Sequence, residues 1–243
     1  RAALMGSQLK DDPLTFYDIP GLFLAHELAH QWWGQSVTPR MYRDRWLSEG
    51  FAQYAAALWT RESLGEEAFN KVLRKLVVWA RRMNQFGPVG LGNRVGHIDN
   101  NPQAHRAVVY DKGALVLDML RRVLGEDGFR KALTSIQFEN RFRPIDPEGA
   151  RRAFEAASGR DLEALWETFV RTTAIPTARI VSHAGGHDIV VEGYSGPLPL
   201  DVRVGNEVRP FIVTGGRAPI PNVPPGARLE LDPYGISLVR TER

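Results

Sequence analysis

The chain has 243 residues, and its 31 basic and 28 acidic side chains give a formal charge of +3. Hydrophobic residues make up 43% and charged residues 24%, a balance that excludes a disordered, collagen-like or coiled-coil chain. No run of about 18 apolar residues occurs, so we expect no membrane span. Basic and acidic residues are interleaved, so we expect no nucleic-acid partner. Cysteine is absent, and a bound metal therefore has to use His, Asp or Glu.

Residues 1–175 carry long helical periodicity. The pattern predicts helices at 19–33, 48–63, 66–85, 105–124, 126–138, 146–157 and 161–171. Gly65 and Gly125 fit helix ends, because acidic residues that suit the start of the next helix follow each of them. The glycine-rich stretch 86–104 predicts a loop.

Residues 176–243 have a different character, with nine of the 16 prolines and short alternating runs between glycine-rich and proline-rich turns. The runs predict strands at 178–182, 188–192, 200–204, 208–213 and 228–231. We therefore expect a small β-domain over residues 176–243. Its boundary is placed at the Ile175–Pro176 step, because a residue before proline disfavours the helical conformation.

The pentapeptide His-Glu-Leu-Ala-His at residues 26–30 is the most informative motif. Two imidazoles four residues apart on a helix lie one turn above each other and can converge on one ion. Glu27 is rotated by about 100° from His26, so it can stand beside the ion and accept a proton from water. The alternative is a solvated helix face with two surface histidines. Uncharged neighbours such as Phe23 and Trp32 favour the metal site.

A catalytic zinc ion needs three protein ligands and one open position. Glu49 is the candidate third ligand, with 18 residues between it and His30. Ser48 is expected to be the N-cap of a second helix, with Glu49 in the first turn. Glu49 could instead only complement that helix's N-terminus, but its spacing from His30 favours the ligand role. We expect His26, His30 and Glu49 to hold one Zn²⁺ ion.

With the surrounding sequences HELAHQWWG and WLSEGFAQY, this spacing resembles that of the gluzincin zinc metallopeptidases of the aminopeptidase N and leukotriene-hydrolase family. The similarity covers most of the chain. It implies a mainly α fold, with a thermolysin-like zinc-peptidase domain over residues 1–175 and a small β-sandwich-like domain over 176–243. It also implies that Glu27 is the general base and that His26, His30 and Glu49 are the zinc ligands.

The same family carries a catalytic tyrosine in a Tyr-x-Lys-Gly segment, and the chain has Tyr-Asp-Lys-Gly at residues 110–113. The resemblance implies that Tyr110 donates a hydrogen bond to the oxyanion of the tetrahedral intermediate. A phenol suits this task, because it is neutral at pH 7 and a good donor.

One part of the family pattern is missing. Its aminopeptidases have a Gly-Ala-Met-Glu-Asn segment before the zinc helix, whose Glu binds the free amine of the substrate. Residues 1–25 contain nothing similar, and the family's N-terminal β-domain is also missing. We expect this chain to be a piece of a longer parent protein that has a further N-terminal domain.

The function implied by the resemblance is a zinc-dependent metallopeptidase that hydrolyses peptide substrates with a zinc-activated water, with aminopeptidase activity expected. Alternatives are an endopeptidase or an epoxide hydrolase on the same zinc site, and a non-catalytic scaffold derived from the family. Retention of Glu27 and Tyr110 speaks against the scaffold, because a binding module needs neither.

Four further polar residues are candidates for a part in metal binding. Asp44 and Gln53 are candidates for orienting a ligand histidine, with ordinary solvated side chains as the alternative. His183 and His187 flank a Gly-Gly turn. We interpret these two as exposed histidines of a hairpin rather than as a second metal pair.

Overall fold

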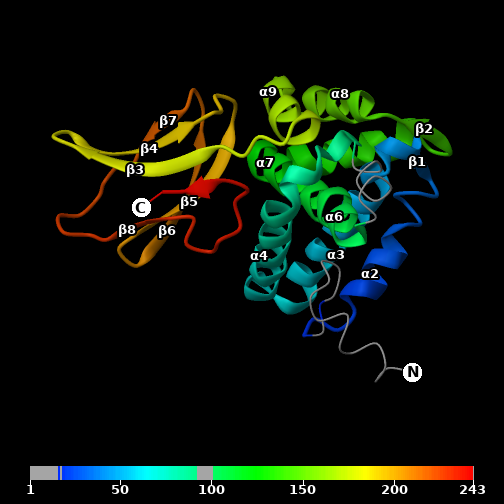
Figure 1. Cartoon of the computed structure of the whole chain (residues 1–243), viewed down its shortest axis with the longest axis horizontal. Helices are drawn as coiled ribbons and strands as arrows, with labels where there is room; N and C mark the ends of the chain where they lie inside the picture. Colours follow the sequence, from blue (N-terminus) through cyan, green and yellow to red (C-terminus); the bar gives the residue numbers. More distant parts are fainter. Residues whose placement is uncertain (1–15, 17, 92–100, 243) are drawn as a thin grey trace.

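The computed structural model describes residues 16, 18–91 and 101–242. Helices fill the part before residue 175, and strands fill most of the part after it (Figure 1). The helices are α2 (Leu22–Ala29), α3 (Trp46–Leu64), α4 (Glu66–Met83), α6 (Pro102–Arg106), α7 (Gly113–Glu139), α8 (Pro147–Ser158) and α9 (Glu163–Trp166). The 3-10 and π-helical turns are η1 (Tyr42–Asp44), η2 (Asn84–Phe86), η3 (Val89–Leu91), η4 (Ala107–Lys112) and η5 (Glu167–Arg171). The expectation of a mainly helical fold with a small β part is confirmed.

Several predicted helix bounds are wrong. The first helix covers Leu22–Ala29 and not 19–33, because the chain leaves helical geometry in the turns before Gly34, whose φ is 126°. The predicted helix end at Gly125 is present, because its φ of 75° and ψ of 165° are non-helical and divide α7 into two helical segments at a kink. The stretch 86–104 contains the helical turn η3, and α6 begins at Pro102. Residues 92–100 of this stretch lie outside the described residues.

Helix α3 is the centre of the helical part, and its buried residues contact α2, α4 and α7. Trp46 at its start is fully buried, with its ring centroid 5.9 Å from that of Trp166. Helix α4 packs on α3 through apolar residues three and four positions apart, such as Phe69, Leu73 and Leu76. The site-bearing helices are therefore held on a rigid apolar core.

Two glycines allow α3 to lie unusually close to the segment that contains Tyr110. A Cβ atom on Gly50 would lie 3.0 Å from the backbone of Gly113 and 3.2 Å from the carbonyl oxygen of Val109. Backbone atoms cannot move aside as a flexible side chain can. Glycine at both positions thus brings Glu49, the neighbour of Gly50, near Tyr110.

The strands are β1 (Val37–Pro39), β2 (Arg143–Ile145), β3 (Thr177–His183), β4 (Gly186–Glu192), β5 (Leu198–Val204), β6 (Glu207–Val213), β7 (Arg217–Pro219), β8 (Leu229–Leu231) and β9 (Arg240–Thr241). Strands β1 and β2 form a small parallel pair within the helical part. The others form two sheets, ordered β7-β4-β3-β9 and β6-β5-β8, on the left of Figure 1. All five predicted strands are present, with bounds shifted by one or two residues at most of their ends.

The β part and the helical part share one buried apolar cluster, which includes Leu120 of α7 and Leu200 of β5. An ion pair between Arg122 Nη2 and Asp201 Oδ1, 2.8 Å apart, joins the same two elements. The division into two domains after residue 175 stays a prediction. Within the described part of the chain, no helix is both long and apolar enough to cross a membrane.

Candidate metal centre

Three predicted ligand side chains converge in the structure. The Nε2 atoms of His26 and His30 lie 3.6 and 3.2 Å from Oε2 of Glu49, and one ligand atom from each residue lies within 4.8 Å of the others. The two imidazole rings are nearly perpendicular, with centroids 4.8 Å apart. Among the described residues, this is the one group of three or more such side chains arranged in this way.

The convergence follows from the packing of α2 on α3. His26 lies on α2, and His30, one helical turn later, is its C-cap residue, so both face α3. Glu49 lies in the first turn of α3 and is buried, with a side chain only 8% exposed. The segment between the two helices is held by the β-bridge between Trp33 and Val37 and by the pairing of β1 with β2.

Hydrogen bonds on the far side of His30 fix its ring. Its Nδ1 lies 2.9 Å from the carbonyl oxygen of Trp33 and 3.3 Å from Oγ of Ser48. Because a carbonyl oxygen can only accept, Nδ1 carries the proton and leaves Nε2 available to a metal ion. Gly34 makes room for this arrangement, since a Cβ atom there would lie 2.6 Å from Oγ of Ser48.

The Ser48 contacts correct one prediction. Helix α3 begins at Trp46, two residues earlier than expected, and Ser48 is not its N-cap. Its hydroxyl instead donates to the carbonyl oxygen of Trp33 at 2.9 Å. Glu49 still lies in the first helical turn, as predicted, because the helix starts only one turn before it.

Glu49 carries a negative charge in a largely buried position. Burial alone would raise its pKa, but the adjacent side chains of His26, His30 and Arg45 outweigh burial and hold the pKa well below its usual range. The neighbouring Glu49 carboxylate raises the pKa of His30 in turn, against the effect of burial. The carboxylate is therefore ionised at neutral pH, the form in which it can bind a metal ion.

Tyr110 lies beside the three ligands. It belongs to η4, a π-helical turn between α6 and α7, and its ring stacks on that of His26 with centroids 5.8 Å apart and an interplanar angle of 14°. Burial and the charge of Glu49 raise the pKa of its phenol well above the usual value. The phenol thus keeps its proton at neutral pH and is a hydrogen-bond donor.

These side chains line a cavity of about 310 Å³. Its lining residues are Leu22, Phe23, His26, Glu27, His30, Arg45, Glu49, Gln53 and Tyr110. Glu27 is exposed and faces this cavity from the same helix as the histidines. All five residues that the sequence singled out for chemistry therefore meet at one cavity.

Of the two residues predicted to orient a ligand histidine, Gln53 lies at the cavity and Asp44 does not. Gln53 is buried and lines the cavity, and its Nε2 lacks a hydrogen-bond partner in the described structure, as does Nδ1 of His26. Its role in orienting a histidine stays a prediction. Asp44 is buried but faces a different pocket, so it is not placed to orient a ligand.

The histidines of the β3–β4 hairpin have local partners. His183 Nε2 lies 3.1 Å from Oδ2 of Asp188, and His187 Nδ1 lies 2.8 Å from Oγ of Ser182. Neither belongs to a three-residue ligand group among the described residues. The interpretation as hairpin histidines agrees with these contacts.

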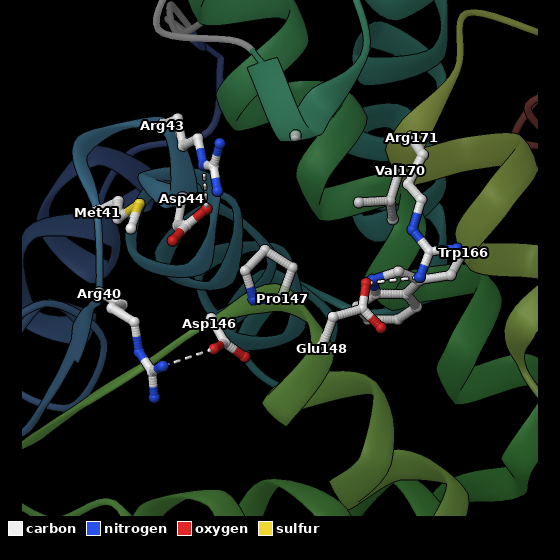
Figure 2. Close-up of a pocket in the computed structure, with 11 residues that line it drawn as sticks. Arg40, Met41, Arg43, Asp44, Asp146, Pro147, Glu148, Trp166, Val170 and Arg171 are labelled. Atoms are coloured by element: carbon white, nitrogen blue, oxygen red, sulfur yellow. Dashed lines mark hydrogen bonds and ion pairs between the residues drawn. The ribbon is translucent and has the colours of Figure 1, made fainter.

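A second pocket, of about 350 Å³, lies between the β1–η1 segment, the start of α8 and η5 (Figure 2). Its charged side chains pair with one another: Arg40 Nη1 lies 3.1 Å from Oδ2 of Asp146, and Arg171 Nη2 lies 2.6 Å from Oε1 of Glu148. Such mutual pairing leaves this pocket without the convergent ligands of the first cavity.

Arg45 is the site residue that sequence reasoning missed. It directly precedes α3, and its Nε donates a hydrogen bond to Oε1 of Glu49 at 3.0 Å. The feature of the sequence that could have pointed to Arg45 is its position four residues before Glu49, a spacing that places both on one helix face. Charge alone did not distinguish it from the many other arginines of the chain.

A helical scaffold with His-Glu-x-x-His on one helix and a glutamate on the next is the arrangement that zinc peptidases use. The family model described as "Peptidase family M1 domain" matches residues 22–169. Since that is more than half of the chain, the chain belongs to peptidase family M1. The resemblance to the aminopeptidase N family is thereby confirmed.

Relatives of this family share moderate identity with the chain. Aminopeptidase M1-C of Oryza sativa subsp. japonica is 29% identical over 179 residues, which cover 73% of this chain and 20% of that protein. Aminopeptidase N of Lactococcus lactis subsp. lactis is 32% identical over 161 residues, which cover 64% and 19%. The chain spans about a fifth of the length of these curated relatives.

The fold is similar to that of a solved structure titled as Legionella pneumophila aminopeptidase A in complex with aspartic acid. The TM-score is 0.66 at 18% sequence identity, over 91% of this chain and 27% of that chain. This likeness supports the same fold.

Proposed function

We propose that the chain contributes the catalytic centre of a zinc-dependent peptidase, with aminopeptidase activity in the parent protein. The observation that carries the proposal is the convergence of His26, His30 and Glu49 beside Glu27 and Tyr110 in one cavity. Membership of peptidase family M1, with relatives named aminopeptidases, supports the same activity.

The ligand set fits zinc. With bonds of ~2.0–2.1 Å to nitrogen and oxygen, neighbouring ligands of a tetrahedral zinc ion lie about 3.3 Å apart. The distances of 3.2 and 3.6 Å between Oε2 of Glu49 and the two histidine nitrogens are close to this value. A bound zinc ion would polarise the peptide carbonyl and make water acidic enough to lose a proton near neutral pH.

The protein's own groups complete the chemistry. Glu27 faces the cavity and is exposed to solvent, which supports a role in accepting a proton from water and later passing one to the leaving amine. Tyr110 keeps its phenolic proton, which supports a role in donating a hydrogen bond to the oxygen that becomes negative during hydrolysis.

Peptide cleavage by the zinc-loaded chain, followed by mass spectrometry, tests the proposal. One peptide has a free amine, and its matched partner is acetylated. Release of the first residue from the free peptide alone supports an aminopeptidase. Cleavage of both at internal bonds supports an endopeptidase instead. The absence of cleavage in both, by a chain that binds stoichiometric zinc, contradicts the activity for this chain.

A further inference from the structure

Arg45 contacts the metal centre from the position directly before α3. It is the N-cap residue of α3, and a cation at a helix N-terminus opposes the helix dipole. Its side chain is 40% exposed and that of Glu49 only 8%, so the ion pair joins a half-exposed cation to a buried carboxylate. Its contact with Glu49 therefore calls for an explanation other than helix stability.

The contact divides the Glu49 carboxylate between two partners. Oε1 accepts the hydrogen bond from Nε of Arg45 at 3.0 Å. Oε2 faces the two histidines, at 3.6 Å from His26 and 3.2 Å from His30. The two oxygens of the Glu49 carboxylate thus have different partners, Arg45 for Oε1 and the two histidines for Oε2.

Arg45 is itself held in place. Its guanidinium carbon lies 5.6 Å from the centre of the Tyr42 ring, and its Nη1 donates to the Tyr42 hydroxyl at 3.4 Å. The Tyr42 side chain precedes Arg45 by one turn, in η1. A guanidinium fixed on one side by an aromatic ring can hold a carboxylate in a defined orientation.

We propose that Arg45 is a positioning residue of the metal centre, which occupies Oε1 of Glu49 and so keeps this carboxylate a one-oxygen ligand through Oε2. The inference rests on the proposed zinc site. A carboxylate that offered both oxygens would take the coordination position that a catalytic zinc keeps open. Partners that orient metal ligands typically change affinity or activity by about 10–100-fold.

The test uses Co²⁺ in place of zinc, because its visible absorption is stronger with four ligands than with five. The chain has no cysteine, so sulfur-to-metal bands cannot obscure the spectrum. In Arg45→Met we expect weaker absorption and a kcat at least ~10-fold lower with little change in KM. Arg45→Lys should resemble Arg45→Met, because an ammonium group has no donor at the position of Nε.

Arg43→Met is the matched control. Arg43 lies two residues earlier, has a 57% exposed side chain and lines the second pocket, so its loss should leave the Co²⁺ spectrum unchanged. Thermal unfolding checks that every variant is folded. A native Co²⁺ spectrum in folded Arg45→Met, or in Arg45→Lys, overturns the role of Arg45 alone. A wild-type chain that binds no Co²⁺ overturns the proposed metal centre and this role with it.

Discussion

Glu27 and His26 are neighbours in the sequence but have different surroundings. His26 is buried against Tyr110, whereas Glu27 is exposed at the cavity. A ligand needs a fixed place beside the ion, and a general base needs access to water and substrate. The helix supplies both through a rotation of about 100° per residue.

Replacement of Glu27 with Gln keeps the shape of the side chain and removes its basicity. We expect zinc affinity to stay unchanged and kcat to fall by about 10²–10⁴-fold, the usual contribution of a general base. Zinc titration and peptide hydrolysis measure the two effects. Glu62→Gln, at an exposed position on α3, is the control. A Glu27→Gln variant with wild-type turnover contradicts the role of Glu27.

Lys112, two residues after Tyr110, is fully buried, and burial lowers its pKa to about 8. Its Nζ donates to Oδ1 of Asn84 at 2.9 Å and to the carbonyl oxygen of Thr172 at 3.2 Å. It connects η4 to the elements around it. Below pH 8 the lysine is charged in both the folded and the unfolded chain.

Between pH 8 and 10.5 the folded lysine loses its proton while the unfolded lysine, with its ordinary pKa of 10.5, keeps it. The unfolded state then binds more protons, so the contribution of Lys112 to the free energy of unfolding rises with pH, by at most roughly 3 kcal/mol. Urea unfolding across this range should show a shallower rise in Lys112→Met. Exposed Lys131→Met should retain the wild-type slope, and equal slopes in all three proteins would contradict the shift.

The close contact between α3 and the Tyr110 segment depends on Gly50 and Gly113. In Gly113→Ala the new Cβ would meet Cα of Gly50 at 3.2 Å and the Trp46 side chain at 3.6 Å. We expect a loss of about 1–3 kcal/mol from overpacking, together with lower activity, because Tyr110 moves away from Glu49.

Gly128→Ala, in the segment of α7 after the Gly125 kink, is the matched control. Its Cβ would contact only the Leu124 side chain, at 3.3 Å, and alanine favours helix by about 1 kcal/mol over glycine. In urea unfolding, Gly113→Ala should lose more free energy of unfolding than Gly128→Ala. Equal changes in the two variants would mean that the contact between Gly50 and Gly113 is not tight.

Sequence reasoning located the metal centre because its elements are local. The spacing of His26 and His30 fixes their common helix face, and the short link to Glu49 brings the next helix to it. The same reasoning missed Arg45 and assigned Ser48 to a cap. Both depend on where α3 begins and on how the chain turns at Gly34, which tertiary packing determines.

At the scale of the whole molecule, Arg122 of α7 and Asp201 of β5 tie the helical part to the β part. Both side chains are 13% exposed, and the two atoms are 2.8 Å apart. Removal of Arg122 leaves Asp201 largely buried without its partner, and breaking such pairs typically costs about 3–5 kcal/mol.

We therefore expect Arg122→Met to lower the midpoint of thermal unfolding. Helical circular dichroism and tryptophan fluorescence report on the helical part, because all tryptophans lie before residue 175. Amide exchange of β5 reports on the β part. Because the two parts share one apolar cluster, they should lose stability together. Separate transitions would instead support two independent domains divided after residue 175.

The π-helical turn η4 sets how the residues before it are rotated about the helix axis relative to α7. Segments α6, η4 and α7 follow one another without a break, and a π turn holds one more residue than an α turn between bonded groups. Deletion of Asp111 would restore α geometry and turn everything before it by about 100° relative to α7. We expect such a chain to keep its helical circular dichroism and lose activity, since Tyr110 would point elsewhere. The one additional residue of the π turn thus determines the direction in which the Tyr110 phenol points.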